Sequence, residues 1–431
     1  MSTTPLHTPG RDGHAPSRPG GRARRLVTLG LALGVAAGLV GAAAYASSNS
    51  DPEAPHRTGA DLELDWQARS GGVQVLGGTR DPGVPSVQRI RHDNVNFTLT
   101  VAPARPGTNI VRVDAARIRD GAVVVHDGHG QKDRHKVYVG TSADFDAGRQ
   151  VRALPRPGAS GLWAAVDLPE GTGTVLVSHG RWHRVPFAVD TGSARSSTDG
   201  WAGPDGPECV TAATAAVLAG GTAPDACPSD ELTDADAAAL RGAVRMLSER
   251  GLDELAVQRD GSPRSVEAYD LVREAAGPAG VRVVEPSAAP GRRNALLVIS
   301  GWDDAATSLA AVASTPLRQQ PIRNDGTWLA PWLLTPAVVD STLGAVLPLD
   351  FDIRDPAAQE FSQTLAALFP GQSPTSSGYV AWRTARGTDA DGLTLYAASR
   401  TAAMPDKGHA GHHSEVAWFP GGTVTPVGRL P

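Results

Sequence analysis

The sequence predicts a multidomain chain made of an N-terminal transmembrane helix, a β-sandwich and an α/β domain with a mainly parallel sheet. Three observations indicate this order. An uncharged apolar run occupies residues 26–46. Short apolar segments separated by Gly, Pro, Asn and Asp follow over residues 62–190, which is typical of antiparallel strands. From residue 207 to residue 431, helical and strand patterns alternate, as they do in α/β proteins.

The apolar run LVTLGLALGVAAGLVGAAAYA has the length of a membrane-spanning helix. At about 1.5 Å per residue it reaches about 31 Å, which matches the hydrocarbon core of a bilayer. Residues 1–25 are rich in Arg, Pro and Gly and predict a disordered cytoplasmic tail, because basic residues flank a span on its inner side. Residues 47–61 predict a polar stalk, so the remainder of the chain is expected outside the membrane. The triplet ending at Ala46 leaves an alternative, in which a signal peptidase cuts near this residue and the protein is secreted.

Composition excludes several functional classes. The formal net charge is −5 and the isoelectric point is near 6.2, so no basic surface for nucleic acid is expected. The basic residues are mostly Arg, and Ala, Gly and Pro are abundant, which is typical of high-G+C, actinobacterial-type genomes. The sequence contains no Gly-x-Ser-x-Gly, Ser-x-x-Lys, phosphate-binding-loop or His-Glu-x-x-His pattern. We therefore expect no enzyme and assign no catalytic residue.

The two cysteines lie close together in the part of the chain that is expected outside the cytoplasm. They are Cys209 and Cys227. An oxidising compartment favours a disulfide between them. The alternative is a pair of free buried thiols.

Seven short apolar runs predict an Ig-like antiparallel sandwich over residues 62–190. The pairs Pro106-Gly107 and Pro157-Gly158 are expected to form turns between strands. The runs cover residues 95–101, 109–113, 122–125, 136–139, 162–166, 174–177 and 185–189.

Two phrases of this region, FTLTVAPARPGTNIVRVDA and GLWAAVDLPEGTGTVLVSHGRWHRVPFAVD, resemble the extracytoplasmic β-sandwich of bacterial copper-resistance and copper-transport proteins. The resemblance implies a sandwich fold and a link to copper handling. Copper-binding members of that family hold the metal with an N-terminal His and further His or Met residues. The domain here does not begin with His, so that metal site does not carry over.

A Gly-, Ser- and Pro-rich segment at residues 191–206 predicts a linker, after which the pattern becomes α/β. Thr233 with Asp236 predicts the N-terminus of a helix that ends at Gly251, and Ser262-Pro263 predicts the start of a second helix. Further helices are expected at residues 303–313 and 356–369, and strands at 252–258, 281–285, 295–300 and 343–347.

Three phrases within residues 254–382 resemble the second lobe of type I periplasmic solute-binding proteins, the branched-chain amino-acid receptor family. They are ELAVQRDGSPRSVEAYDLVREAAGPAGVRVVE, NALLVISGWDDAATSLAAV and GAVLPLDFDIRDPAAQEFSQTLAALFPGQSPTSSGYVAW. The resemblance implies a periplasmic-binding-protein-like fold. If the anchor at residues 26–46 is retained, a neighbouring membrane transporter is the expected partner. Such receptors bind ligand between two lobes, whereas the region 207–431 is too short for both. The first lobe is therefore expected to be shortened, and the family's ligand contacts do not carry over.

A His-containing tail is the main candidate metal site. Imidazole and thioether groups suit copper or zinc, and a Gly-rich segment allows them to converge. The candidate ligands are Met404, His409, His412 and His413. The alternative is a solvated loop before a last strand pair at residues 418–427. A second group is formed by His126, His129 and His135, which alternatively are exposed turn residues.

Two Trp residues form a candidate ligand wall. Trp328 and Trp332 lie four residues apart in a chain that is only 5% aromatic. The alternative is that both pack beneath a loop. The acids of LDFDIRDP are candidates for a site at the end of a strand, although Asp355 before Pro356 also fits a helix cap. The two other acids of this phrase are Asp350 and Asp352.

These features predict a membrane-anchored extracytoplasmic solute-binding or sensing protein that is linked to copper handling. The second hypothesis is a cell-envelope interaction module without a small-molecule ligand. An enclosed pocket in the α/β domain favours the first, and its absence favours the second.

Overall fold

The protein is described from a computed structural model. The described residues are 73–78, 81–92, 95–117, 136–179, 182–194, 200–369, 371–400, 418–419 and 422–430. Residues Leu62–Pro431 cluster as one compact unit. The predicted tail, membrane span and stalk lie outside the described residues. Within those residues, no helix combines the length and the apolar character that crossing a membrane requires.

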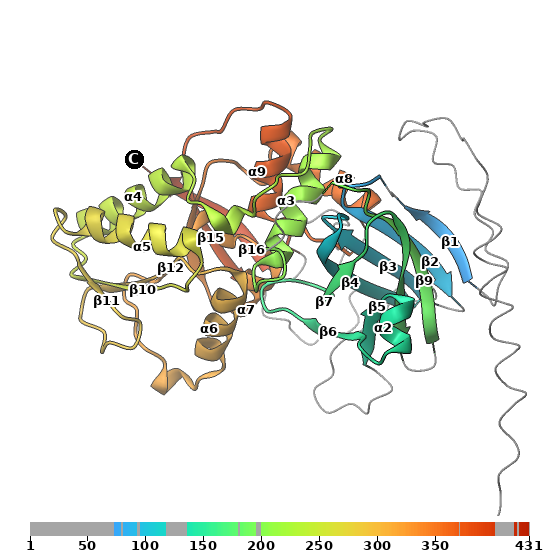
Figure 1. The fold of residues 1–431 in the computed structure, drawn as a ribbon. Coiled ribbons are helices and arrows are strands. Elements are labelled where there is room, and N and C mark those ends of the chain that lie inside the picture. The colour runs from blue at the N-terminus through green and yellow to red at the C-terminus, as the bar shows by residue number, and fades with distance from the viewer. Residues whose placement is uncertain are drawn as a thin grey trace, which may run out of the picture. The chain divides into compact units, whose positions relative to one another are not determined.

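The first sheet contains nine strands, and every neighbouring pair is antiparallel (Figure 1). Its strand order is β1(Val73–Gly78), β2(Ser86–His92), β3(Val95–Ala102), β4(Gly107–Arg117), β7(Leu162–Leu168), β6(Val151–Pro155), β5(Val137–Gly140), β8(Thr172–His179) and β9(Trp182–Asp190). A short helix, α2(Ser142–Asp146), follows β5.

This sheet forms two layers that share one core. Strand β6 pairs with β7 at one end and with β5 at the other, so it passes from one layer to the other. The Gln88 amide on β2 donates to the carbonyl of Ala188 on β9, which brings the two layers into contact. Phe97 of β3 and Phe187 of β9 are both buried in the same hydrophobic cluster. The apolar runs therefore form strands because their alternate residues enter this core.

Six of the seven strands expected in this region are present, as β3, β4, β5, β7, β8 and β9. The seventh, at residues 122–125, lies outside the described residues. Strands β1, β2 and β6 were not expected from the sequence. In β2, buried Gln88 interrupts the apolar pattern, and in β6 only Ala153 is buried.

The second sheet contains seven strands and carries helices (Figure 1). Its order is β11(Arg282–Val284), β10(Glu254–Gln258), β12(Asn294–Val298), β13(Thr327–Leu329), β14(Ala345–Leu349), β15(Thr394–Arg400) and β16(Gly422–Arg429). The first five strands are parallel, and the last two are added antiparallel. The helices are α3(Gly206–Leu218), α4(Asp234–Glu249), α5(Pro263–Ala276), α6(Trp302–Ser314), α7(Pro336–Ser341), α8(Pro356–Leu368) and α9(Ser376–Ala385), with short 3-10 turns η2(Pro228–Asp230), η3(Leu317–Gln319) and η4(Pro331–Leu333).

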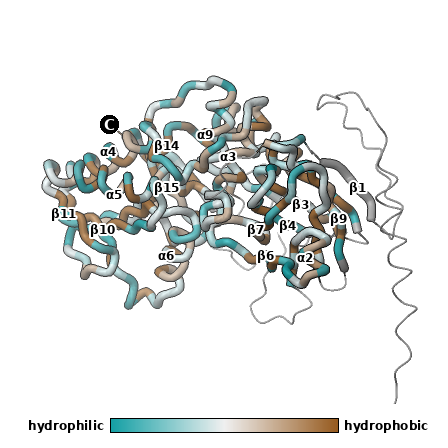
Figure 2. The backbone as a smooth tube through the Cα atoms, in the orientation of Figure 1, coloured by the Kyte–Doolittle hydropathy of each residue, from teal (hydrophilic) through white to brown (hydrophobic). Residues whose placement is uncertain are grey.

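The helices cover both faces of this sheet. The chain passes from β10 to β11 through α5, and from β12 to β13 through α6, in opposite directions across the sheet. Because such crossovers are right-handed, α5 and α6 lie on opposite faces. Figure 2 shows hydrophobic residues along strands of both sheets and hydrophilic residues in many connecting loops.

The helices expected near 234–250, 263–276, 303–313 and 356–369 are present as α4, α5, α6 and α8. The predicted last strand pair at 418–427 needs correction. Among the described residues of that range, the strand is β16, which continues to Arg429, and its partner is β15. Trp418 and Phe419 are not strand residues but are buried in the core, where the Trp418 indole donates to the carbonyl of Ala358 at 3.1 Å.

The segment expected as a linker, residues 191–206, is partly built into the fold. Trp201 and Asp205 are buried, and α3 begins at Gly206. Trp201 belongs to a cluster that also contains Trp163 of β7 and Cys209 of α3. The Gly-, Ser- and Pro-rich composition of residues 191–206 predicted a flexible linker. Buried Trp201 and Asp205 instead attach the end of this segment to the fold.

Candidate functional site

The β-sandwich contacts the α/β sheet at the carboxyl edge of the parallel strands. The Thr335 hydroxyl donates to the carbonyl of Gly158 at 3.1 Å. In addition, the backbone N–H of Trp302, in the first turn of α6, donates at 3.1 Å to the carboxylate of Asp205, which follows the sandwich and precedes α3. The Arg112 guanidinium of β4 donates to the carbonyl of Gly371. A cavity lies next to these contacts, at the carboxyl edge of the parallel strands.

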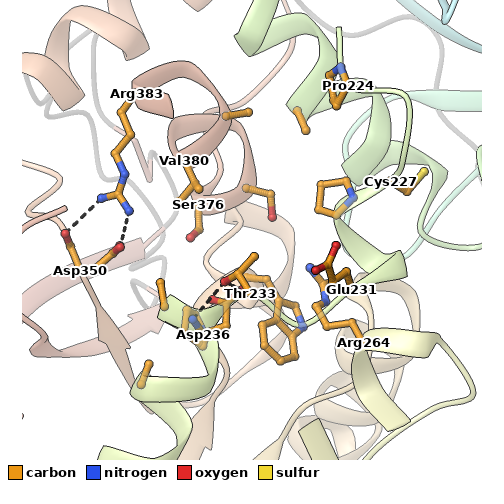
Figure 3. A pocket seen from close by; sticks show the side chains of 18 of the residues that line it. Pro224, Cys227, Glu231, Thr233, Asp236, Arg264, Asp350, Ser376, Val380 and Arg383 are labelled. Carbon is orange, nitrogen blue, oxygen red and sulfur yellow. Dashed lines mark hydrogen bonds and ion pairs between the residues drawn. The ribbon is translucent and has the colours of Figure 1, made fainter. Parts of the chain in front are cut away.

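This cavity, called here the Trp332 cavity, has a volume of about 300 Å³. It is lined by the loop before η2, the N-terminal turns of α4, the start of α5, η4, the end of β14 and α9 (Figure 3). Open α/β sheets bind ligands at the carboxyl ends of their strands, and the cavity has that position. Its lining residues are Ala212, Pro224, Ala226, Cys227, Pro228, Glu231, Thr233, Ala235, Asp236, Ala239, Arg264, Pro331, Trp332, Asp350, Ser376, Ser377, Val380, Ala381, Arg383 and Leu393.

Trp332 is the largest apolar side chain among the lining residues, and it is 2% exposed. Its indole N–H donates to the carbonyl of Ser300 at 2.9 Å, and its own carbonyl accepts from the Trp302 indole at 2.8 Å. Both ends of the residue are therefore held by buried hydrogen bonds. An aromatic wall that is fixed in this way is available to a ligand with little further loss of side-chain entropy.

Arg264 projects from the start of α5 and is already paired. Its guanidinium donates to both carboxylate oxygens of Glu208 on α3, at 2.8 and 2.7 Å. The Ser377 hydroxyl donates to the same carboxylate. The Arg264 guanidinium carbon also lies 4.4 Å from the centre of the Trp332 ring. The positive charge of Arg264 is thus balanced inside the protein.

Arg383 of α9 is the second cation at the cavity, and it is also paired. It donates to the carboxylate of Asp350, at the end of β14, and to the Asp350 carbonyl at 3.1 Å (Figure 3). Both arginines of the lining therefore have a carboxylate partner.

Asp236 also lines the cavity, but among the described residues it forms no ion pair with a cation. Its carboxylate accepts from the Thr233 hydroxyl at 2.8 Å (Figure 3). Burial raises the pKa of Asp236 to about 6, although the charge of Arg264 and the bond from Thr233 oppose the rise. It is ionised at neutral pH. Glu231 adds a second carboxylate, and among the described residues neither acid forms an ion pair. The cavity therefore has an excess of negative charge.

The predicted disulfide is confirmed, and it forms part of the cavity wall. Cys209 of α3 is bonded to Cys227, which precedes η2. The same loop carries Pro224 and Pro228 of the lining. Asp230 accepts from the backbone N–H of Cys227 at 2.9 Å. The disulfide thus fixes one wall of the cavity to a helix that contacts the sandwich.

The two Trp residues predicted as a ligand wall are separated by the structure. Trp332 lines the cavity, whereas Trp328 is 1% exposed in the middle of β13 and does not line it. The Trp328 indole donates to the carbonyl of Asp325 at 3.0 Å. The prediction that Trp328 forms part of a ligand wall is therefore corrected. Trp328 lies on β13 and Trp332 lies on the following turn η4, so the two side chains point in different directions.

Of the three acids that the sequence offered for a site at the end of a strand, Asp350 lines the cavity. Asp352 instead accepts from Arg354, and Asp355 is the N-cap residue of α8. The candidate metal ligands lie outside the described residues, namely Met404, His409, His412, His413, His126, His129 and His135. In the described ranges, no group of three or more His, Cys, Asp or Glu residues is arranged to hold a metal.

Sequence reasoning did not identify Glu208, Arg264 or Ser377 as site residues. One local signal was available for Arg264, because a cation in the first turn of a helix is electrostatically unfavourable. Such a residue requires a nearby acid, here Glu208. Asp236 was recognised only as part of a helix cap.

Solved structures similar to this chain include solute-binding proteins of ABC transporters. No protein-family model matches the sequence, and no curated protein matches it. A solute-binding protein of an R. palustris ABC transporter, solved with benzoate, has 11% identity and a TM-score of 0.27 over 35% of this chain and 46% of that chain. A solute-binding protein from Rhodopseudomonas palustris BisB5, solved with 3,4-dihydroxybenzoic acid, has 13% identity and a TM-score of 0.30 over 46% and 66%.

A branched-chain amino-acid ABC transporter periplasmic ligand-binding protein from Burkholderia xenovorans has 10% identity and a TM-score of 0.29, over 51% of this chain and 75% of that one. This chain spans about half the length of the first of these structures. The neighbours are type I periplasmic solute-binding proteins, the class that residues 254–382 resemble, and the likeness covers part of the chain.

Proposed function

We propose that this chain is a non-enzymatic extracytoplasmic solute-binding or sensing protein whose ligand occupies the Trp332 cavity. The observation that supports the proposal is the combination of a fixed aromatic wall with a carboxylate that lacks a cation, at the carboxyl edge of a parallel sheet. A partly open cavity at this position supports solute binding over the alternative of an interaction module without a ligand.

The charges of the cavity select the class of ligand. Arg264 and Arg383 are already paired, so they offer little to an anion. Asp236 and Glu231 remain available to a protonated amine. The volume of about 300 Å³ lies at the lower end of small-molecule sites. We infer a small organic amine with an apolar body that packs on Trp332.

Calorimetric titration of the purified full chain tests this inference with two probes of similar length and opposite charge, 2-phenylethylammonium and phenylacetate. We expect the ammonium probe to bind and the carboxylate probe to bind far more weakly. Asp236→Asn should weaken ammonium binding about 10- to 100-fold, because a hydrogen bond to a charged group contributes about 1.5–3 kcal/mol. Asp234→Asn is the matched control, because this acid lies in the same first turn but is exposed and does not line the cavity.

Two results would contradict the proposal. In one, the carboxylate probe binds as well as the ammonium probe. In the other, Asp236→Asn and Asp234→Asn have equal effects on binding. A chain that binds neither probe nor any member of a broader amine set would favour the interaction module.

We propose that residues 26–46 anchor the protein and that the Ig-like sandwich holds the α/β domain near a membrane transporter. Support comes from the apolar run and from the basic residues before it. Carbonate extraction of cell membranes tests the anchor. Recovery of the protein in the soluble fraction, with a new N-terminus near Ser47, would show that it is secreted instead.

The link to copper rests on the sandwich resemblance and on the tail with Met404, His409, His412 and His413. Titration of the full chain with Cu²⁺ and Zn²⁺ tests it. We expect a variant with Ala at the three His positions of the tail to lose most of the metal affinity. Equal affinity of this variant and the native chain would remove the tail from consideration as a metal site.

A further inference from the structure

A second cavity lies on the α/β sheet, away from the carboxyl-edge site. This Arg323 cavity has a volume of about 310 Å³ and shares no lining residue with the Trp332 cavity. It is lined by β12, α6, the start of β13 and the segments before β13 and β14. The lining residues are Gln258, Pro286, Leu296, Val298, Ser308, Leu309, Val312, Ala313, Gln320, Pro321, Arg323, Gly326, Thr327, Thr342, Leu343 and Gly344.

One side of this cavity is hydrocarbon, and Gln258, Ser308, Gln320, Thr327 and Thr342 add polar groups to the lining. Leu296 and Val298 lie on the same face of β12, because side chains alternate along a strand. Leu309 and Val312 of α6 face them, three residues apart on one side of the helix. Leu343, at the entrance to β14, is 47% exposed and continues the apolar surface outward.

Arg323 is the only charged residue among those that line the cavity. It is half-buried, and one of its terminal nitrogens donates to the carbonyl of Pro286 at 2.9 Å. Its Nε atom is buried without a hydrogen-bond partner in the described part of the chain. Arg323 forms no ion pair among the described residues, so an anion beside its terminal nitrogens would be stabilised by its charge.

Among the described residues, no acid forms an ion pair with Arg323. Glu254 is the carboxylate whose charge acts on it, but Glu254 already accepts from Arg282 and from the backbone N–H of Gly291, the latter at 2.8 Å. Burial lowers the pKa of Arg323 from its ordinary value, although the group stays charged at neutral pH. The guanidinium fork is therefore available to a ligand.

The segment that carries Arg323 also exposes apolar side chains. Leu317 is 81% exposed and Ile322 is 70% exposed. Neither residue lines the cavity, and both add exposed apolar surface to the segment before β13.

We propose that the Arg323 cavity binds a monocarboxylate with a hydrocarbon tail. The carboxylate accepts from the terminal nitrogens of the Arg323 guanidinium, in a charge-assisted contact. The tail packs between β12 and α6 and leaves past Leu343. This site differs from the Trp332 cavity in place and in charge, so the inference stands independently of the proposed function.

Titration of the full chain with octanoate, octylammonium and octanol tests the inference. Octanoate should bind, and octylammonium should not bind at this site. Arg323→Gln should weaken octanoate binding about 10- to 100-fold, in keeping with the loss of charge-assisted hydrogen bonds. The matched control is Arg318→Gln, because Arg318 is exposed five residues earlier and does not line the cavity. Its effect should remain within about twofold.

A filling variant gives a second readout. Ala313→Phe places a ring in the cavity from the side of α6, and octanoate binding should be lost while the thermal unfolding midpoint stays close to that of the native chain. Asp236→Asn, in the other cavity, should leave octanoate binding unchanged. Equal effects of Arg323→Gln and Arg318→Gln on octanoate binding, or octanol binding as tightly as octanoate, would overturn the proposal.

Discussion

Glu208 and Arg264 form a bidentate ion pair whose two N–O distances are 2.8 and 2.7 Å, and both side chains are almost fully buried. Glu208 belongs to α3, the helix that packs on the sandwich, and Arg264 begins α5 of the α/β domain. The ion pair therefore links helix α3, which packs on the sandwich, to a residue that lines the Trp332 cavity.

Breaking this pair from one side should destabilise the protein strongly. Glu208→Ala leaves the Arg264 charge buried without a partner, and we expect a loss of about 3–5 kcal/mol in the free energy of unfolding. Asp253→Ala is the matched control, because Asp253 pairs with Arg293 at the surface and should cost less than about 1 kcal/mol. Urea unfolding followed by Trp fluorescence measures both. Equal losses would show that the buried pair has no special role.

Gly158 should be essential for the contact between the sandwich and the α/β domain. Its φ is +79°, and a Cβ atom there would lie 2.4 Å from the carbonyl oxygen of Trp302. Gly148 has a φ of +68° but open space around it, so it isolates the backbone strain alone.

We expect Gly148→Ala to cost about 1 kcal/mol in unfolding free energy, because an L-residue is strained at positive φ. Gly158→Ala should cost several times more and should separate the unfolding of the sandwich from that of the α/β domain. Calorimetric unfolding of both variants provides the measurement. One cooperative transition of equal stability in the two variants would contradict the expected role of Gly158.

The disulfide between Cys209 and Cys227 should support both stability and binding. It closes a loop with a sequence separation of 18, and its replacement by two Ser residues should cost about 3 kcal/mol in unfolding free energy. Because Pro224 and Pro228 line the cavity from this loop, binding of 2-phenylethylammonium should weaken as well. Native and double-Ser chains are compared by urea unfolding and by calorimetric titration. Unchanged binding in the double variant would show that the loop keeps its place without the bond.

Asp205 should make stability depend on pH. Burial, with the nearby Glu208 charge, raises the pKa of Asp205 to about 7, and Arg264 opposes the rise. Since this folded-state pKa lies above the unfolded value, the folded protein binds the extra proton between about pH 4 and pH 7. Stability contributed by this group therefore falls as the pH rises through that window.

Asp205→Asn removes the charge and keeps an oxygen that accepts from the Trp302 N–H. The variant should unfold at higher urea than the native chain at pH 8. This advantage should shrink as the pH falls below about 7 and vanish near pH 4. Urea unfolding at five pH values gives the test, and a difference that is constant with pH would disprove the assignment.

Local signals in the sequence predicted much of the α/β part. Thr233 caps α4 by accepting from the backbone N–H of Asp236, and Pro263 begins α5 as expected. Such features depend on neighbours along the chain, so pattern and spacing reveal them. Helix α3 was not predicted, because its Ala, Thr and Gly residues give no amphipathic period. Eleven of its residues are buried, so packing on all sides holds it.

The sequence by itself indicated an α/β region with four of its helices, most strands of the sandwich and a disulfide between the two cysteines as the favoured alternative. These follow from residue periodicity, turn residues and compartment, which are local or compositional properties. Only the tertiary structure decided that Trp332 lines a cavity while Trp328 does not, and that Arg264 is matched by Glu208 over a separation of 56 residues. A binding site depends on which side chains remain unpaired after folding, and pairing across such distances leaves no periodic trace in the sequence.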